Sequence, residues 1–337
     1  MTVVVTGASG HVGGNLVRAL VAAGREVRVL VREDTRALEG VAVERVRGDV
    51  RDPDSLRAAF EGAQVVFHLA ALISIVGDQG GLVTQTNVEG PRNVARACLD
   101  CGVPRLVHTS SIHAFNLRSR EGQIDEAGPR SSGSRFNPYD RSKAAGEVEI
   151  RKAIDQGLDA VIVNPTGVIG PLDYKLSRMG EVFLQLSQRK LPSLIDGGFN
   201  WVDVRDVVAG LLAAETKGRR GESYILGGRW ASVGELANIA ESVTGVRVPR
   251  MTSPMWLAQV GAPFMEAWAK LTKTTPLYTA EALEALRANP RVSIAKAERE
   301  LGYAPRPLED SVRDIYTWFA EQGRLGPLAH ANFAPAK

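Results

Sequence analysis

Three residues with acid–base or hydrogen-bonding side chains stand at spacings that could bring them together. Tyr139 and Lys143 lie four residues apart in the segment YDRSK, at the start of a stretch with helical periodicity, so they would share one helix face. An ammonium group beside a phenol lowers its pKa, so Tyr139 could exchange a proton with a carbonyl or alcohol oxygen near neutral pH. Ser111 follows the apolar run 106–109, and its hydroxyl could bind the same oxygen.

Each of these features also has a plainer interpretation. A Tyr and a Lys four residues apart occur often by chance on helices, and Thr109, Ser110 and Ser111 could simply form a turn that leaves a strand. The chemical interpretation is favoured because the three residues follow a glycine-rich turn in the same chain.

That turn lies near the start of the chain. TGASGHVG (6–13) follows an apolar run and opens a helical stretch. Glycine permits a tight turn there and lets backbone N–H groups approach a pyrophosphate. A purely structural turn is the alternative, but the strand–turn–helix context favours a dinucleotide site. Its predicted residues are Gly7, Gly10, His11, Val12 and Gly13.

The residue after the second apolar run indicates which dinucleotide binds. NAD sites usually place Asp or Glu there, whereas Arg32 follows Val31 and Arg36 lies close behind. A guanidinium suits a 2′-phosphate, so NADP(H) is preferred over NAD(H). Glu33 and Asp34 could instead bind a plain ribose, and Arg32 could be only a surface charge.

Two further segments follow predicted strands. Asp49 and Val50 come after the third apolar run, where a carboxylate could accept a hydrogen bond from the adenine amino group or could cap a turn or the helix that Asp52 opens. Leu69, Ala70 and Ala71 end the fourth apolar run, and small residues there would let a cofactor ribose lie against the backbone.

Alternating short apolar runs and helical stretches predict the elements that hold these residues. Strands are expected at 2–6, 27–31, 43–46, 65–69, 106–109 and 160–163, with helices at 11–23, 52–60, 88–99 and 139–154. Such β-α repeats indicate a Rossmann-type, doubly wound parallel sheet covered on both faces.

The last third is less regular, with helical stretches at 233–243, 279–287 and 311–319. We expect a dinucleotide-binding domain over 1–165 and about 200–228, and a smaller, mainly helical substrate lobe over about 166–199 and 229–325. The Gly- and Ser-rich stretch 118–135 is expected to be a mobile surface loop, either an inert insertion or a lid.

Composition excludes several classes of protein. The net charge of +3 is spread over the chain without a basic stripe, which argues against a nucleic-acid partner. No apolar run reaches the ~18–20 residues of a membrane span, and no signal peptide precedes the first strand, so a cytoplasmic protein is expected. Cys98 and Cys101 lack a second ligand pair, so no metal site is predicted.

Motifs along nearly the whole chain resemble the extended short-chain dehydrogenases/reductases, within the broad NAD-dependent epimerase/dehydratase family. The closest resemblance is to dihydroflavonol reductase-like and hopanoid-associated sugar epimerase-like members. The matching segments are TGASGHVGG (6–14), LVR (30–32), GDVRD (48–52), HLAA (68–71), NVEGPRNV (87–94), VHTSS (107–111), YDRSK (139–143), VNPTGVIGP (163–171), VDVRDV (202–207), YILGG (224–228) and KAERELGYAPRPLEDS (296–311).

The resemblance implies roles for individual residues. Tyr139 would be the acid/base, Lys143 would lower its pKa and bind the nicotinamide ribose, and Ser111, rather than Ser110, would orient the substrate oxygen. The cofactor contacts that it implies are Gly7, Gly10 and Gly13 at the pyrophosphate, Arg32 at the 2′-phosphate, Asp49 and Val50 at adenine, and Pro165 and Val168 along the nicotinamide.

The family pattern implies less about other positions. Asn87 matches a helix position near the site with a less certain role, and a homodimer would pack the helices around 88–101 and 140–154. His113 stands where many members carry Thr or a small residue, so it could reach the substrate, although a structural histidine is the commoner case.

Two enzymatic activities fit these motifs, and a non-catalytic cofactor-bound regulator is a third, disfavoured class. A reductase acting on a ketone or aldehyde, or a dehydrogenase acting on the alcohol, is favoured over a nucleotide-sugar epimerase or dehydratase that recycles its cofactor. The latter needs cations for a second pyrophosphate, for which Lys175, Arg178, Arg189 and Arg229 are candidates, each more simply a solvent-facing charge.

The stretch 255–271 also carries apolar residues near helical spacing. They are Trp256, Leu257, Val260, Phe264, Trp268 and Leu271. A helix that packs into the small lobe is the favoured interpretation, and a surface for a lipid-like substrate is the alternative.

Overall fold

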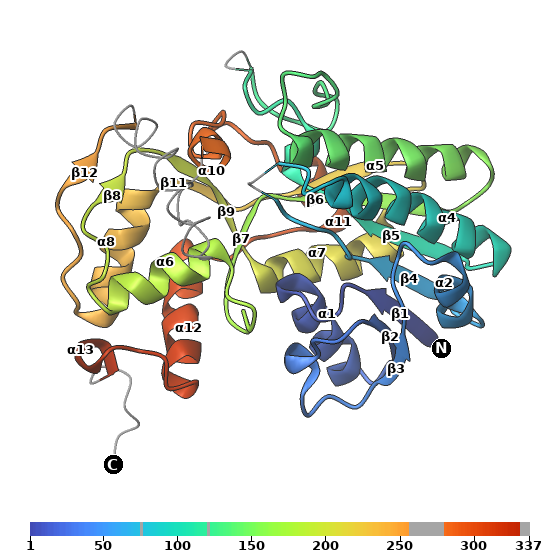
Figure 1. The fold of residues 1–337 in the computed structure, drawn as a ribbon, viewed down its shortest axis with the longest axis horizontal. Helices are drawn as coiled ribbons and strands as arrows, with labels where there is room; N and C mark the ends of the chain where they lie inside the picture. Colours follow the sequence, from blue (N-terminus) through green and yellow to red (C-terminus); the bar gives the residue numbers. More distant parts are fainter. Residues whose placement is uncertain (75–76, 120–121, 256–279, 331–337) are drawn as a thin grey trace.

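The short apolar runs of the first half fold into one parallel sheet. The computed structural model describes residues 1–74, 77–119, 122–255 and 280–330 (Figure 1). Seven strands lie in the order β3-β2-β1-β4-β5-β6-β10. They are β1 (Thr2–Thr6), β2 (Glu26–Val31), β3 (Glu44–Arg47), β4 (Val65–His68), β5 (Arg105–Thr109), β6 (Ala160–Pro165) and β10 (Ser223–Leu226).

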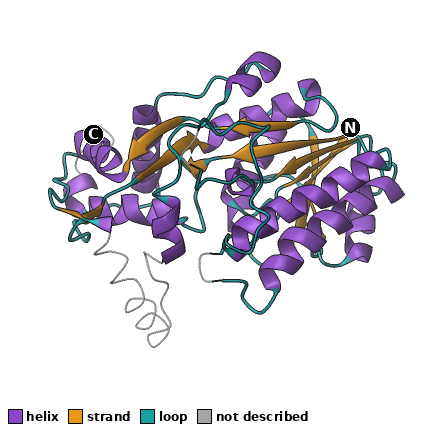
Figure 2. Cartoon of the chain, turned by 90° about the horizontal axis from the view of Figure 1, so that it is seen from above, coloured by secondary structure: helices purple, strands orange, loops and turns teal. Residues whose placement is uncertain are grey.

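Helices cover both faces of this sheet. One face packs against α1 (His11–Ala22), α7 (Val204–Lys217) and α11 (Ala295–Leu301), and the other against α2 (Pro53–Phe60), α4 (Gly90–Asp100) and α5 (Pro138–Asp155) (Figure 2). Successive β1 residues serve the two cores, because Val3 and Val5 point to the α1 side and Val4 to the α2 side. This arrangement confirms the predicted doubly wound α/β fold.

A small lobe lies beyond the carboxyl end of β6 (Figure 1). Its strands are β7 (Gly167–Ile169), β9 (Gly198–Asp203) and β11 (Arg229–Ser232) in one sheet, and β8 (Leu194–Ile195) and β12 (Thr252–Ser253) in another. Its helices are α6 (Arg178–Ser187), α8 (Val233–Thr244), α10 (Ala280–Ala285), α12 (Leu308–Glu321) and α13 (Pro327–His330). Phe183, Tyr316 and Phe319 fill its core. The lobe therefore contains two small sheets beside the predicted helices.

The chain passes between the two parts several times. Thr166 alone separates β6 of the large sheet from β7 of the small lobe. The chain returns at the end of β9, where the Asp203 carboxylate accepts the backbone N–H of Arg205 at 2.8 Å and caps α7. The Arg306 side chain, just before α12, donates to Asp206 of α7 at 2.9 Å. A division into two domains stays a prediction.

The stretch 118–135 is tied to the molecule on two sides. The backbone N–H of Ile124 donates to Arg291 O at 2.8 Å, and that of Ser131 donates to Ala114 O at 2.9 Å. The guanidinium of Arg130 lies over the Phe115 ring, 3.8 Å from its centre. The described part of this stretch is thus an anchored surface loop, and its function as a lid stays a prediction.

Short elements complete the description. They are η1 (Arg36–Leu38), α3 (Leu82–Thr84), the π-helical turn η2 (Gln85–Glu89) and η3 (Ile112–Ala114). Within the described ranges, no helix has both the length and the apolar character to cross a bilayer. The predicted apolar stripe from Trp256 to Leu271 lies outside the described residues.

Candidate active site

The glycine turn between β1 and α1 leaves no room for side chains. Gly7 adopts a φ of 72°, in the left-handed region. A Cβ there would lie 2.6 Å from Ala70 N, and a Cβ on Gly13 would lie 2.2 Å from Gly7 O. Gly10 is the N-cap of α1, and no described side chain caps the helix. The backbone cradle and the exposed helix N-terminus fit the pyrophosphate of a dinucleotide.

The end of β4 lies against this turn. The Thr6 hydroxyl hydrogen-bonds to His68 Nδ1 at 2.7 Å and accepts the backbone N–H of Ala70 at 3.3 Å. Leu69 and Ala70 are therefore held beside Gly7, and Ala71 follows at the surface. Contact of these residues with a cofactor stays a prediction.

Two other predicted residues at the turn have partners within the chain. His11 Nε2 hydrogen-bonds to the carbonyl oxygen of Pro171 at 2.9 Å, so this ring joins α1 to the small lobe. Val12 is half-buried against the core beneath α1.

Asp49 forms a turn of its own at the end of β3. Its carboxylate accepts the backbone N–H of Arg51 at 3.0 Å and the guanidinium of the same residue at 3.0 and 2.9 Å. Asp52 instead caps α2, by accepting the backbone N–H of Asp54. Val50 packs into the core beside α4. Two structural roles were predicted for Asp49, capping a turn or capping α2, and the structure shows that it caps the turn.

Ser111, Tyr139 and Lys143 come together where β5 ends and α5 begins. The Ser111 hydroxyl lies near enough to the Tyr139 hydroxyl to favour its ionised form. The Lys143 ammonium donates to the carbonyl oxygen of Thr109 at 3.3 Å. All three side chains belong to residues no more than 9% exposed, so they lie in a desolvated site.

Burial shifts the two ionisable groups of this trio in opposite directions. It raises the pKa of Tyr139 to about 12, against the hydrogen bond from Ser111, with a small further rise from the Asp140 charge. It lowers the pKa of Lys143 to about 8, against the attraction of Glu147. The expectation that Lys143 depresses the Tyr139 pKa is therefore wrong for this structure, because desolvation of the phenolate outweighs the other effects.

Two histidines lie beneath the trio, and the sequence interpretation gave them no role. The rings of His68 on β4 and His108 on β5 stack with centres 5.1 Å apart. Burial, together with the Lys143 charge, lowers both pKa values, that of His68 to about 3, so both rings are neutral at pH 7. The signal was present in HLAA and VHTSS, which carry a histidine at matched positions of adjacent strands.

Glu147 is a second residue that the motifs did not single out. It lies one helical turn after Lys143 and is 1% exposed. Its carboxylate accepts the amide of Asn164 on β6 at 2.6 Å and the guanidinium of Arg130 at 3.1 Å. The same Asn164 amide donates to Ser111 O at 3.0 Å. Glu147 therefore joins α5, β6 and the Ser111 backbone.

Asn87 has a comparable positioning role. Its amide donates to the Ser142 hydroxyl at 3.0 Å and to Leu72 O at 2.9 Å, and its oxygen accepts the Leu72 N–H at 2.8 Å. A Cβ on Gly146 would lie 2.4 Å from Asn87 O, so α5 packs closely on this segment.

His113 touches both hydroxyl-bearing residues. Its backbone N–H donates to Ser111 Oγ at 3.2 Å, and its Nδ1 lies 2.8 Å from the Asp140 carboxylate. The ring meets Tyr139 edge-on at 5.4 Å and stacks on Phe199 at 5.9 Å. The His113–Asp140 bond supplies the structural role expected for this histidine, and substrate contact stays a prediction.

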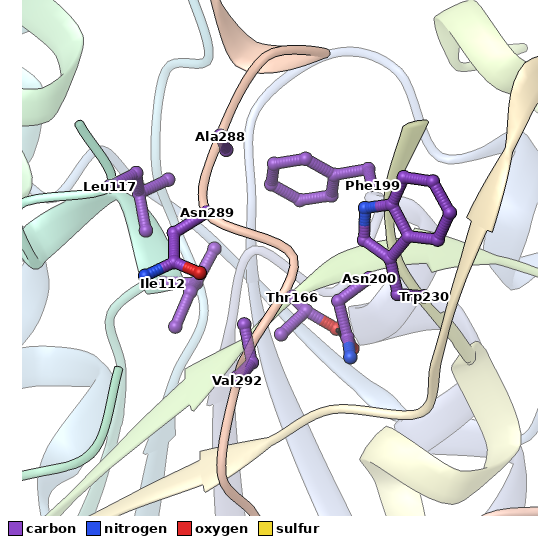
Figure 3. A pocket seen from close by; sticks show the side chains of 9 residues that line it. All are labelled: Ile112, Leu117, Thr166, Phe199, Asn200, Trp230, Ala288, Asn289 and Val292. Carbon is purple, nitrogen blue, oxygen red and sulfur yellow. Dashed lines mark hydrogen bonds between the residues drawn. The ribbon is translucent and has the colours of Figure 1, made fainter. Parts of the chain in front are cut away.

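A small pocket opens beside this site (Figure 3). It is lined by Ile112, Leu117, Thr166, Phe199, Asn200, Trp230, Ala288, Asn289 and Val292. The polar members are occupied, because Asn200 Oδ1 accepts from Thr166 and Gly228 at 2.9 Å, and the Asn289 amide donates to Ser119 O at 2.9 Å. The lining carries no charged side chain in the described part of the chain.

The candidate cations for a second pyrophosphate do not line this pocket. Arg229 pairs with Glu235 at 2.5 Å and with Glu309 at 3.3 Å. Lys175 reaches the glycine turn instead, where it donates to Ser9 Oγ at 3.2 Å. Arg178 begins α6, and Arg189 follows that helix.

Of the three remaining predicted contacts, Pro165 and Val168 lie at the junction of the two sheets, and Arg32 lies after β2. Pro165 ends β6, and Val168 lies on β7 opposite Val202 of β9. Arg32 follows β2 with its side chain 74% exposed.

At the end of α4, Cys98 is buried and Cys101 half-buried, and the described residues hold no group of acids, histidines and cysteines that could bind a metal.

Comparisons with known proteins identify a family that matches most of this chain. A family model described as the NAD-dependent epimerase/dehydratase family matches residues 3–227. The chain is 36% identical over 329 residues to sterol demethylase protein B of Methylococcus capsulatus, covering 96% of this chain and 100% of that protein. It is 34% identical over 331 residues to a putative dihydroflavonol 4-reductase of Synechocystis, covering 95% and 94%.

Solved structures show the same architecture. Gox2253 matches with a TM-score of 0.83 and 34% identity, over 96% of this chain and 99% of that chain. The dTDP-glucose 4,6-dehydratase DesIV from Streptomyces venezuelae, solved with NAD and TYD bound, matches with a TM-score of 0.77 and 25% identity, over 97% and 100%.

Proposed function

The chain belongs to the NAD-dependent epimerase/dehydratase family of extended short-chain dehydrogenases/reductases, and we propose that it is an NADP(H)-dependent reductase of a ketone or aldehyde, or a dehydrogenase of the alcohol. The observation that carries this proposal is the buried trio of Ser111, Tyr139 and Lys143 at the carboxyl edge of the sheet. The residue after Ser111, Ile112, lines a pocket that carries no charged side chain among the described residues.

Each residue of the trio has its own role in the proposed reaction. A bound nicotinamide supplies or accepts the hydride. The Tyr139 hydroxyl donates a proton to the substrate oxygen, and its pKa of about 12 keeps it protonated at neutral pH, which suits carbonyl reduction. The Ser111 hydroxyl binds the same oxygen and stabilises its developing charge. Lys143 binds the nicotinamide ribose.

The cofactor preference rests on the end of β2. The exposed Arg32 guanidinium can bind a 2′-phosphate through two parallel hydrogen bonds. The Asp49 carboxylate, 3.9 Å from Arg32, lies on the adenine side in this proposal.

The uncharged lining beside the trio supports an apolar substrate over a nucleotide sugar, and at about 10 Å³ the cavity must open further to admit either. A second pyrophosphate needs cations, and none lines the pocket among the described residues. The relatives above are named for a sterol and a dihydroflavonol, neither of which is a nucleotide sugar. The second candidate is a nucleotide-sugar epimerase or dehydratase, which the similarity to DesIV favours.

A spectrophotometric assay tests the proposal. Purified protein is mixed with NADPH and a panel of cyclic ketones, aromatic aldehydes and 3-oxo esters, and absorbance at the nicotinamide band is followed. We expect turnover that Tyr139→Phe lowers by at least ~100-fold, because the proton donor is lost. Tyr224→Phe is the control, since that hydroxyl bonds to Glu300 and Arg219, away from the site. Isomerisation of a nucleotide sugar, with every carbonyl inert, would overturn the reductase in favour of the second candidate.

We further propose that the enzyme works in the cytoplasm as a homodimer that pairs α4 and α5 of two copies. These helices pack together on one side of the sheet, and α5 carries Val148, which is 49% exposed. Light scattering of wild type and Val148→Glu tests the assembly, because a charge at the centre of such an interface should give monomers.

A further inference from the structure

Two carboxylates stand at the ends of neighbouring strands, and each already has a close arginine. The Asp34 carboxylate, after β2, binds the Arg36 guanidinium through two bonds of 3.1 and 2.9 Å. The Asp49 carboxylate, after β3, binds Arg51 in the same way at 3.0 and 2.9 Å. Each of these pairs is neutral as a unit and needs no further cation.

Each carboxylate nevertheless has a second cation at a longer distance. The nearest nitrogen of Arg32 is 3.9 Å from Asp49, and Lys175 Nζ is 3.7 Å from Asp34. The two side chains are 74% and 43% exposed. Such loose, solvated contacts contribute little, so both cations can turn to a stronger anion at small cost.

The position of Lys175 in the fold indicates which anion the two loosely paired cations would bind. Its ammonium also donates to Ser9 Oγ at 3.2 Å, so it lies between the glycine turn and the end of β2. In Rossmann sites, the 2′-oxygen of the adenosine ribose lies at the end of this second strand, whereas the pyrophosphate lies over the helix N-terminus. Its pairing with Asp34 puts Lys175 on the ribose side of the turn.

The small lobe holds Lys175 in this place. Pro171 O accepts from His11 Nε2 at 2.9 Å and from Asn15 at 3.3 Å, both on α1. Lys175 stands between Leu172 and Leu176, whose φ angles of 62° and 55° lie in the left-handed region that non-glycine residues rarely adopt. Such a backbone persists only where its surroundings hold it, so the loop is fixed on α1.

We propose that Lys175, a small-lobe residue, binds the 2′-phosphate of NADP(H) opposite Arg32. The inference rests on the cofactor assignment of the proposed function. On binding, the two loosely paired cations move to the phosphate dianion, while Asp34 and Asp49 keep Arg36 and Arg51. Cofactor selection then draws one cation from the parallel sheet and one from the small lobe.

Calorimetric titration of the whole protein tests this without turnover. Wild type, Lys175→Gln and the control Lys190→Gln, an exposed lysine of the same lobe, are titrated with NADPH, NADH, 2′-AMP and 5′-AMP. We expect Lys175→Gln to raise the Kd for NADPH and 2′-AMP about tenfold, the effect of one charge-assisted hydrogen bond, and to change those for NADH and 5′-AMP less than about twofold. The control should change none of the four.

The outcomes separate the inference from the function beneath it. An unchanged Kd for NADPH in Lys175→Gln, or equal losses for NADPH and NADH, would overturn the 2′-phosphate contact even in an active reductase. A wild type that binds NADH at least as tightly as NADPH would instead refute the cofactor assignment and, with it, the inference. A Lys175-dependent preference for NADPH with no activity on any carbonyl would support the contact and refute the reductase.

Discussion

At the scale of single residues, burial sets the acid–base properties of the site. Tyr139 and Lys143 lie in the same desolvated volume, and each favours its neutral form there. A phenol that stays protonated is a proton donor, and an ammonium that titrates near pH 8 is held at a cost in stability. That cost can be measured.

The substitution Lys143→Met should stabilise the fold at pH 7. Burial lowers the pKa of Lys143 from 10.5 to about 8, so between these values the unfolded chain binds more protons, and stability rises with pH. Below pH 8 the full cost of burying the charge is present, up to about 3 kcal/mol. We expect the variant's advantage in the free energy of unfolding to shrink as pH rises from 8 to 10, as measured by urea denaturation.

The comparison isolates Lys143 because other groups titrate equally in both proteins. Lys190→Met, on an exposed side chain, is the control and should show no such pH dependence. An advantage that stays constant from pH 7 to 10 would mean that the methionine acts through packing alone.

The proximity of Ser111, Tyr139 and Lys143 could be predicted from the sequence, and the surroundings of these residues could not. Tyr139, Lys143 and Ser111 are marked by spacing and by the ends of apolar runs. Glu147 and Asn164 meet only when α5 lies across β6, so no local pattern joins residues 17 positions apart. The direction of the Tyr139 pKa was wrong for a related reason, because spacing gives the neighbouring charge but not the loss of water.

At the scale of elements, helix α5 is the part on which the site depends. Its N-cap Asn137 accepts the Asp140 N–H at 2.8 Å, and Pro138 begins the helix, so the first turn that carries Tyr139 is well defined. Glu147, further along the helix, fixes it to β6 and to the loop 118–135 through Asn164 and Arg130.

The substitution Arg130→Ala should destabilise this junction. It leaves the buried Glu147 carboxylate without its nearest cation, and breaking a buried pair costs about 3–5 kcal/mol, here reduced because Arg151 remains at 3.9 Å. We expect a fall of roughly 2–3 kcal/mol in the free energy of unfolding, with faster cleavage of the loop in limited proteolysis.

A neighbouring arginine provides the matched control. Arg135 lies in the same loop, is exposed and lies over the Phe136 ring at 5.0 Å. Its replacement by Ala should cost less than about 1 kcal/mol, as is usual for an exposed cation–π pair. Equal losses for the two variants would show that the Glu147 pair adds nothing beyond a surface contact.

Elements with a regular apolar pattern could be predicted closely, and the others could not. The predicted strand 2–6 is β1, and the predicted helix 52–60 is α2, which begins one residue later, at Pro53. Helices α6 and α7 were missed, since both lie in stretches interpreted from motifs or prolines and not from helical periodicity. The π-helical turn η2 before α4 depends on the close contact of Asn87 with Gly146, which is set by tertiary packing.

At the scale of the whole molecule, the large sheet and the small lobe are interleaved along the chain. Strand β6 leads to β7 through Thr166, β9 leads back into α7, and β10 then pairs with β6. Near the end of the chain, α11 packs on the large sheet and α12 in the small lobe. Neither part is made from one uninterrupted stretch.

We therefore expect the large sheet and the small lobe to unfold in one transition, although the small lobe has a core of its own. Every tryptophan lies at position 201 or later, so intrinsic fluorescence reports mainly on the small lobe. The buried Cys98 thiol lies in α4 beneath the large sheet. In a Cys101→Ser background, pulsed labelling of Cys98 and tryptophan fluorescence should give coincident urea midpoints. Midpoints that differ by more than the fitting error would show two independently unfolding units.

The loop from Pro171 to Lys175 has a consequence for the way this scaffold can change. This loop belongs to the small lobe and is hydrogen-bonded to α1 and to Ser9 of the glycine turn. The proposed role of Lys175 therefore implies that a graft of residues 166–199 from a relative, made to alter substrate range, would also exchange part of the coenzyme selection. Substrate range and coenzyme use are then inherited together, and a designer who wants only one of them must keep this loop when replacing the rest.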